Sequence, residues 1–403
     1  MFSVIDVLYL IFAFFSIYFT FLFLLIFFEK KEEMEGYRTT KKFPFVSFIV
    51  AAHNEERIIK KMLENLKKVD YPNYEIIVVN DGSTDRTSEI AKKCKVKVID
   101  KKKTGKADSL NSGLKYARGE IVACVDADSF PKKDCLKKTV GFFEDPKIGA
   151  VTVTALVKNP KSFLEKMQEL EYAMIAWNRK LLDFIDSVYV TPGTLSLYRK
   201  NLLIKLGGFD RKNLTEDIEM TWRIRRAGYE AKMVLSTETY TIVPKDLKKW
   251  FRQRVRWTIG GFQTLFKYKD TFFKRIYGSL GLFICPFFML GFILSLLALA
   301  IYSYVYFDWI IKNIIFFYKS YSVGASMPTI ELIFLPNIFT IMGLTIFFLS
   351  IFYVYICLRS LKLKIMGFKN FFNLLCYLVF YLSVFPFIIL ISLVKILRQK
   401  YEW

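Results

Sequence analysis

The chain has 403 residues, 53% of them hydrophobic, with a formal net charge of +22 and a sequence pI near 9.5. The apolar residues gather at the two ends, which a single soluble core would not require. The basic balance suits an anionic lipid surface or a phosphorylated substrate, and we expect no nucleic-acid partner because no nucleic-acid-binding motif accompanies it. Six cysteines without CxxC spacing and a single histidine exclude a common zinc motif, so we interpret the cysteines as reduced packing residues.

The first expected element is a membrane anchor over residues 1–29. Residues 4–28 are almost wholly apolar, and a membrane span needs about 20 such residues. The segment lacks the basic start and the small-residue cleavage site of a signal peptide, so we expect it to be retained. Lys30 and Lys31 follow the span, which predicts that the next domain lies in the cytoplasm.

Residues 43–244 have the composition of a globular domain. Apolar strand patterns at 45–50, 74–79, 95–99 and 121–125 alternate with helical patterns such as 56–68 and 83–93. This alternation predicts an α/β fold with a Rossmann-like, mostly parallel sheet covered by helices. Ligands bind beyond the carboxyl ends of such strands, and Asn54, Asp81 and Asp126 each follow a strand.

Residues 245–270 mix aromatic and aliphatic residues with basic ones, which is typical of a helix lying on a membrane surface. A helix packed on the globular domain is the alternative. A C-terminal membrane region, 278–397, follows with about three helices expected at 278–307, 332–356 and 371–397. The basic segment 359–369 is expected in the cytoplasm and 308–331 outside.

Two features count against this simple topology. Four spans would place Lys395, Arg398 and Lys400 outside, against the usual distribution of basic residues. A re-entrant or interfacial segment within 308–331 would change the number of spans.

Polar residues after the strands suggest a nucleotide site. Asn54 and Glu55 are positioned to hold a base or ribose, whereas His53 suits packing or base stacking better than proton transfer. Asp81 can accept hydrogen bonds from a base or ribose, or it can cap a helix. Lys106 lies in a basic, glycine-containing turn that suits a pyrophosphate, although such turns are often only solvated.

Carboxylates supply the remaining chemistry. Asp126 and Asp128 flank one residue at a strand end, and their hard oxygens suit Mn²⁺ or Mg²⁺ together with substrate phosphates. Asp217 begins a helical pattern at about 218–227, where a carboxylate is either a cap or a general base. Each pattern is weak alone, and their order along the chain carries the functional hypothesis.

The motifs Asn-Asp-Gly-Ser at 80–83, Asp-Ala-Asp at 126–128, Thr-Glu-Asp at 215–217 and Gln-x-x-Arg-Trp at 253–257 occur in this order. Over about 44–257 the chain thereby resembles the inverting family 2 glycosyltransferases of the GT-A fold. The last motif resembles that of the membrane subset with hyaluronan, chitin, cellulose and poly-N-acetylglucosamine synthases.

The resemblance implies a role for each matching residue. Asp81 and Asp126 look like contacts to uridine and ribose. Asp128, together with Asp126, looks like the metal ligand, and Asp217 looks like the base. The acceptor side would consist of Gly193, Thr194, Gln253 and Trp257, with Trp257 as a stacking platform, and Arg256 would contact the nucleotide sugar. The implied reaction is transfer from a UDP-sugar, such as UDP-N-acetylglucosamine or UDP-glucose, to a growing β-linked polysaccharide that the protein exports.

Two other functions are weighed against this one. Ceramide glucosyltransferases and related enzymes share the acidic motifs and a (Gln/Arg)-x-x-Arg-Trp element but add one sugar to a membrane lipid. Polymer synthases that export their product commonly carry more spans than the four expected here. A non-catalytic membrane scaffold is disfavoured because Asp128, Asp217 and the Gln-x-x-Arg-Trp motif are intact. The size of the product separates the first two functions, and the oligomeric state is left open.

Overall fold

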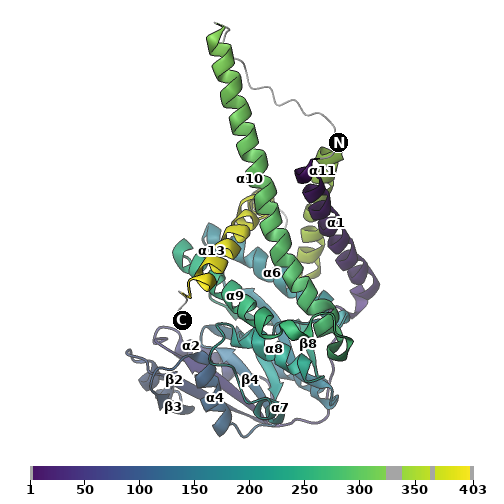
Figure 1. Cartoon of the computed structure of the whole chain (residues 1–403). Helices are drawn as coiled ribbons and strands as arrows, with labels where there is room; N and C mark the ends of the chain where they lie inside the picture. The colour runs from purple at the N-terminus through teal and green to yellow at the C-terminus, as the bar shows by residue number, and fades with distance from the viewer. Residues whose placement is uncertain (1–2, 324–337, 364–367, 400–403) are drawn as a thin grey trace.

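The computed structural model describes residues 3–323, 338–363 and 368–399. Figure 1 shows an α/β body with long helices standing on one side of it. Within the described residues, the body contains one eight-stranded sheet in the order β3-β2-β1-β4-β7-β6-β8-β5. The strands are β1 Val46–Ala52, β2 Tyr74–Asp81, β3 Lys97–Lys101, β4 Ile121–Asp126, β5 Ser129–Pro131, β6 Ile148–Val157, β7 Ser196–Arg199 and β8 Glu230–Thr241.

The sheet is mostly parallel, as the strand pattern predicts. β1 pairs in parallel with β2 and β4, β2 with β3, and β6 with β8. β7 runs antiparallel to β4 and β6, and β5 runs antiparallel to β8. The register places Ala51 beside Asp126 and Ala52 beside Asn80, so β1, β2 and β4 end together at one edge. Apolar residues pack on both faces of the sheet, which explains why the parallel strands are apolar throughout.

Helices cover both faces of this sheet. Those of the body are α2 Ile59–Leu66, α3 Thr87–Lys93, α4 Lys106–Tyr116, α5 Cys135–Thr139, α6 Phe163–Phe184, α7 Lys200–Lys205, α8 Glu216–Arg226 and α9 Leu247–Lys267. The helix expected from residue 83 begins only at Thr87, because the Asp85 carboxylate accepts the Thr87 N–H at 3.0 Å and shapes a turn instead.

Two helices of the body face the membrane helices. α6 begins with a capping box, in which Ser162 and Glu165 satisfy each other's backbone N–H groups. α9 is capped by Asp246, whose side chain accepts the Lys249 N–H. α9 packs against α8 and α13, and its Trp250 and Arg254 are each only 2% exposed. The assignment of residues 245–270 to the membrane surface stays a prediction.

Four helical segments in the described residues are long and apolar enough to cross a bilayer, which marks the chain as a membrane protein. They are α1 Val4–Lys30, α10 Cys285–Ser322 with a preceding π-helical turn at Leu280–Ile284, α11 Ile338–Ser360, and a final segment through α13 Phe385–Leu397. Many of their large apolar side chains point outward, as lipid contact would require.

Two of these segments differ from expectation. α10 continues to Ser322 and not to 307, and the last segment is interrupted between α12 Phe368–Cys376 and α13. Pro386 lies in the first turn of α13, where its missing N–H costs nothing. Residues 324–331, residues 364–367 of the expected cytoplasmic segment, and Lys400 lie outside the described residues.

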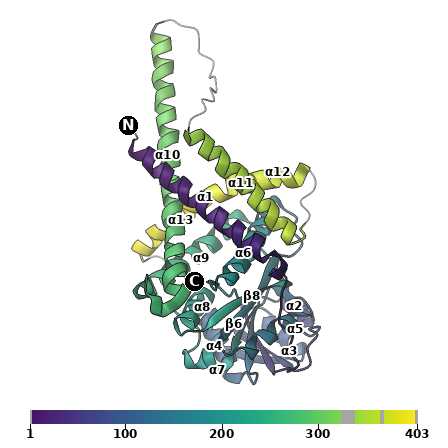
Figure 2. The same ribbon diagram turned by 90° about the vertical axis from the view of Figure 1, so that its right-hand side faces the viewer.

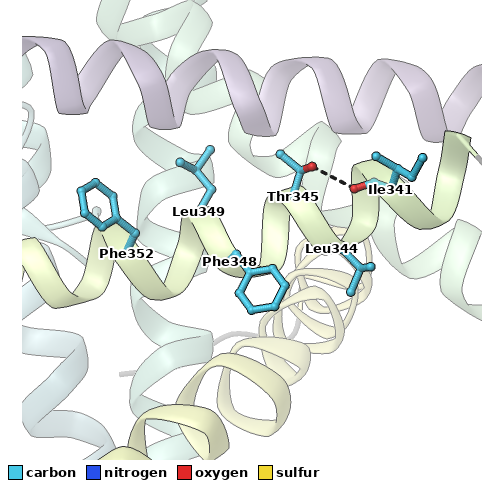
Figure 3. A pocket seen from close by; sticks show the side chains of 6 residues that line it. All are labelled: Ile341, Leu344, Thr345, Phe348, Leu349 and Phe352. Atoms are coloured by element: carbon cyan, nitrogen blue, oxygen red, sulfur yellow. Dashed lines mark hydrogen bonds between the residues drawn. The ribbon is translucent and has the colours of Figure 1, made fainter.

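Figures 1 and 2 show α1 and α11 side by side, while the far half of α10 rises beyond both. An apolar hollow on α11 is drawn in Figure 3. Its polar group, the Thr345 hydroxyl, donates to the Ile341 carbonyl of the preceding turn at 2.9 Å. None of the six residues that line it is charged, so this hollow suits a lipid chain and offers no chemistry.

Candidate active site

A cavity of about 390 Å³ lies where the carboxyl edge of the sheet meets α6, α8, α9 and the first turns of α10 and α13. It gathers predicted site residues that are far apart in the sequence. The ones that line it are Lys106, Asp126, Asp128, Gly193, Thr194, Asp217, Gln253, Arg256 and Trp257. The structure thus places most of the predicted residues around one space.

Lys106 lies at the centre of the acidic cluster. Its Nζ is 2.6 Å from Asp126 Oδ1 and 2.9 Å from Glu216 Oε1. The neighbouring carboxylates raise the pKa of Lys106 against the effect of burial, so the side chain stays cationic. Gly193 makes room for this pair, because a Cβ there would stand 2.4 Å from Lys106 Nζ. Beside it, the buried Thr194 hydroxyl has no hydrogen-bond partner in the described part of the chain.

Asp128 has no cationic partner among the described residues. Its Oδ1 accepts hydrogen bonds from Ser129 Oγ at 3.3 Å and Thr241 Oγ1 at 3.4 Å. Burial, and then the charge of Asp126, raise the pKa of Asp128 to about 6. A cation that enters the cavity would therefore stabilise the ionised form of this carboxylate.

The acidic pair fits a divalent cation that takes most of its ligands from elsewhere. Among the described residues, no group of three or more His, Cys, Asp or Glu side chains is arranged to hold a metal. Asp126 and Asp128 would therefore hold a cation of the Mg²⁺ or Mn²⁺ type with one or two carboxylates. Substrate phosphates and water usually complete such a shell.

Asp217 stands in the first turn of α8 and faces the same cavity. Its Oδ1 accepts the Ile218 N–H at 2.9 Å, which fixes the side chain. Burial and the adjacent Glu216 raise the pKa of Asp217 to about 6. A carboxylate with a pKa near the working pH is suited to accept a proton from a hydroxyl group.

The Gln-x-x-Arg-Trp segment belongs to α9 and is held from α6. Arg254, between the motif positions, forms a two-point ion pair with Glu171 in which Nε donates to Oε1 at 2.9 Å. Its guanidinium carbon lies 4.3 Å from the ring centroid of Trp257, and its Nη1 donates to Gln253 Oε1 at 2.6 Å. Arg254 thus covers part of the Trp257 indole, while that side chain also lines the cavity.

Three predicted residues lie along the same sheet edge but do not line the cavity. Asp81 accepts from Lys101 Nζ at 2.7 Å and from the Thr104 and Gly105 N–H groups, so it fastens the loop before α4. Asn54 accepts the Thr84 N–H at 2.8 Å. Burial and the charges of Asp128 and Asp85 raise the pKa of Glu55 to about 7. Their assignment to the nucleotide sugar stays a prediction.

α6 contributes residues that sequence reasoning missed. Tyr172, Ala176 and Arg179, spaced at four and three residues, present one face of this helix to the cavity. Glu171 lies beside them, and its Oε2 also accepts from the Tyr381 hydroxyl at 2.5 Å. The only feature of the sequence that points to this face is the pair Glu171 and Arg179, which lie eight positions, or two four-residue steps, apart on an amphipathic helix.

The membrane helices close the cavity on its remaining side. Phe288 and Phe292 of α10 and Phe385 and Ile389 of α13 line it. The Tyr189 ring packs on Phe288 with centroids 5.5 Å apart. The cavity therefore joins a charged floor on the sheet edge to an apolar wall at the start of the membrane helices.

Comparisons with known proteins agree with this geometry. The model of the family described as "Glycosyltransferase like family 2" matches residues 44–260, more than half of the chain. The poly-beta-1,6-N-acetyl-D-glucosamine synthase of Staphylococcus aureus (strain COL) is 33% identical over 243 residues, which cover 59% of this chain and 57% of that protein. The Staphylococcus epidermidis synthase is 34% identical over 229 residues, 55% and 56% of the two chains. The chain thus spans little more than half of the length of these curated relatives.

Among solved structures, the mannosyltransferase PcManGT from Pyrobaculum calidifontis, in complex with GDP-Man and Mn²⁺, covers 97% of this chain and 99% of its own. Its TM-score is 0.56 and its sequence identity is 21%, which shows a shared fold that includes the membrane helices. The α/β body is of the GT-A type, and the chain belongs to the glycosyltransferase family 2.

Proposed function

We propose that this family 2 glycosyltransferase transfers a sugar from a UDP-sugar to an acceptor held between the α/β body and the membrane helices. The observation that carries the proposal is that one cavity contains Asp128, Asp217 and Trp257 and ends on apolar side chains of α10 and α13. The proposed donor, base and acceptor positions therefore share a space whose apolar wall belongs to the membrane helices.

The proposed reaction is a single displacement. The acceptor hydroxyl gives its proton to Asp217, its oxygen forms a bond to the anomeric carbon, and the bond from that carbon to the UDP oxygen breaks. One displacement inverts the anomeric centre, so an α-linked donor gives a β-linked product. A divalent cation held by Asp126 and Asp128 would neutralise charge on the departing diphosphate.

In the first form of the proposal, the acceptor is a growing β-linked polysaccharide, which the protein also exports. The curated relatives named as polysaccharide synthases support it. Trp257 supports it as well, because an indole that lines the cavity can stack on a sugar ring without reading the rest of the chain.

In the second form, the protein adds one sugar to a membrane lipid. The apolar wall favours this form, because Phe288, Phe292 and Phe385 offer hydrocarbon contact and no hydrogen-bonding groups to a sugar polymer. The four candidate spans of the described residues also fit a small lipid acceptor.

The two forms are separated by the product. The full-length protein in lipid nanodiscs is incubated with UDP-N-acetylglucosamine, UDP-glucose or GDP-mannose, with Mn²⁺ or Mg²⁺, and the products are sized. We expect transfer from a UDP-sugar that stops with excess chelator, with Asp217→Asn as the inactive control. Long chains support the first form and single additions support the second. Transfer from GDP-mannose but from neither UDP-sugar contradicts the proposed donor.

A further inference from the structure

Arg179 is a buried cation without a partner among the residues that the structure describes. Its side chain on α6 is only 4% exposed, and within the described residues neither Nε nor Nη1 has a hydrogen-bond acceptor. In the described residues, no carboxylate oxygen lies within 4 Å of a side-chain nitrogen of Arg179, which is the distance limit for an ion pair. An unpaired buried charge costs several kcal/mol, so a retained one calls for a partner in the working state.

The other buried basic residues show how this protein normally treats such charges. Arg254 pairs with Glu171, Lys180 with Asp183, and Arg225 with Asp186. In the part of the chain that the structure describes, Arg179 is the buried basic side chain that lacks this compensation. Burial lowers the pKa of Arg179, but a guanidinium keeps its charge at any physiological pH.

The position of Arg179 points away from the donor. Tyr172 lies on the same face of α6 as Arg179, about 10 Å nearer the start of the helix. The ring centroids of Tyr172 and Trp257 are 6.4 Å apart. Lys180, the residue after Arg179, donates to the Met233 carbonyl of β8 at 3.1 Å, eight positions along that strand from Thr241, whose hydroxyl contacts Asp128. Arg179 therefore lies away from Asp128 in the cavity, whose lining also includes Asp217, Tyr189 and the Phe288 ring on which Tyr189 packs.

We propose that Arg179 binds the phosphate group of a membrane-lipid acceptor. The hydrocarbon tail lies against Phe288 and Phe292, and the accepting hydroxyl lies at Asp217. A guanidinium binds phosphate through two parallel hydrogen bonds, and the dry surroundings strengthen that pair. A neutral sugar polymer would leave this charge uncompensated. The inference rests on the proposed transferase and selects its lipid form.

The test measures binding without turnover. The full-length protein in detergent is titrated with farnesyl phosphate, farnesol or inorganic phosphate, without a donor. The variants are Arg179→Gln, Arg179→Lys and the charge-matched control Arg118→Gln, whose side chain pairs with Glu75 on the exposed surface. We expect Arg179→Gln to weaken farnesyl phosphate by at least about tenfold, Arg179→Lys to weaken it less, and Arg118→Gln to leave it unchanged. Binding of farnesol, and of UDP with Mn²⁺, should not change in Arg179→Gln.

Several outcomes overturn the inference. One is equal affinity of the unaltered protein for farnesyl phosphate and farnesol. Another is inorganic phosphate binding as tightly as farnesyl phosphate. A third is a loss of UDP affinity in Arg179→Gln that parallels the loss of farnesyl phosphate affinity. The last outcome would move Arg179 to the donor site. If Arg179→Gln does not fold, Arg179→Lys carries the test, since it must bind farnesyl phosphate less tightly than the unaltered protein.

Failure of the transferase is distinguishable from failure of this inference. Binding of farnesyl phosphate through Arg179 without transfer from any nucleotide sugar contradicts the enzyme but not the phosphate site. Transfer to a phosphorylated lipid acceptor at equal rates in Arg179→Gln and the unaltered protein contradicts the phosphate site alone.

Discussion

At the scale of single residues, the carboxylates of the cavity divide by whether a cation faces them. Asp126 and Glu216 share Lys106, whereas Asp128 and Asp217 have no ion-pair partner in the described chain. The pKa values of the unpaired carboxyls are each raised to about 6. Lys106 therefore orients Asp126 and Glu216, whereas Asp128 lacks a cation until a metal binds and Asp217 is available to accept a proton.

The raised pKa of Asp217 predicts the acid limb of the pH profile. A base works in its ionised form, and raising its pKa moves the loss of that form upward toward neutral pH. With saturating Mn²⁺, kcat should fall as the pH drops through about 6 and be about tenfold lower at pH 5. Initial rates of transfer between pH 5 and 8 measure this.

Asp217→Asn provides the control for that profile. It should lower kcat by about 10²- to 10⁴-fold, abolish the acid limb in the residual rate and leave UDP affinity nearly unchanged. A limb that moves with Mn²⁺ concentration would assign the titration to Asp128. A loss of UDP affinity in step with rate would make Asp217 structural.

At the scale of elements, α9 is fitted directly against the start of α8. A Cβ on Gly260 would stand 2.2 Å from Thr215 Oγ1, next to the Glu216–Asp217 pair. α9 also contacts α13, and the Trp250 indole N–H donates at 2.7 Å to the hydroxyl of Tyr381, which precedes α13. The close approach at Gly260 therefore sets the distance between Trp257 and Asp217.

Gly260→Ala should separate these two elements. The added methyl group forces α9 or Thr215 to move, at a cost of about 1–3 kcal/mol. We expect a lower Tm and a transfer rate that falls more than UDP affinity does. Gly291→Ala, in α10, is the matched control because a Cβ there meets nothing within 4 Å. Wild-type turnover in Gly260→Ala would show that the α8–α9 distance does not matter for the reaction.

At the scale of the whole molecule, the orientation of the membrane helices would decide on which side of the bilayer the α/β body and its cavity lie. The end of α11 meets the end of α1 near the body, where Lys362 Nζ pairs with Glu35 Oε1 at 2.8 Å. α10, with 38 residues, is about 57 Å long, whereas the hydrocarbon core of a bilayer is about 30 Å thick. The helix is therefore longer than a span requires, and Figure 2 shows its far half rising beyond α1 and α11.

This arrangement predicts the topology, with the α/β body in the cytoplasm. In a Cys94→Ser background, since the other five cysteines are buried, an impermeant maleimide should label Ser320→Cys on sealed cells. Lys362→Cys should react only after the cells are made permeable. Labelling of Lys362→Cys on intact cells would place the body, and hence the donor site, outside.

The sequence by itself determined the parallel strands β1 to β4 of the sheet, the order of the acidic motifs, the family and the presence of four apolar segments. These features are local, because a short run of consecutive residues is enough to indicate a buried strand, a carboxylate at a strand end or a membrane span. Helix ends such as Thr87 and Ser322 departed from expectation, because side-chain capping and helix continuation depend on small local energies.

Only the tertiary structure decided which residues share the cavity. Glu171 and Arg254 are 83 positions apart, and Arg179 lies on a helix whose pattern reads equally well as a core-packing face. The choice between packing, pairing and lining a site depends on which elements meet, and the periodicity of one helix does not contain that information. The unpaired charge of Arg179 became visible only when its possible partners among the described residues had positions.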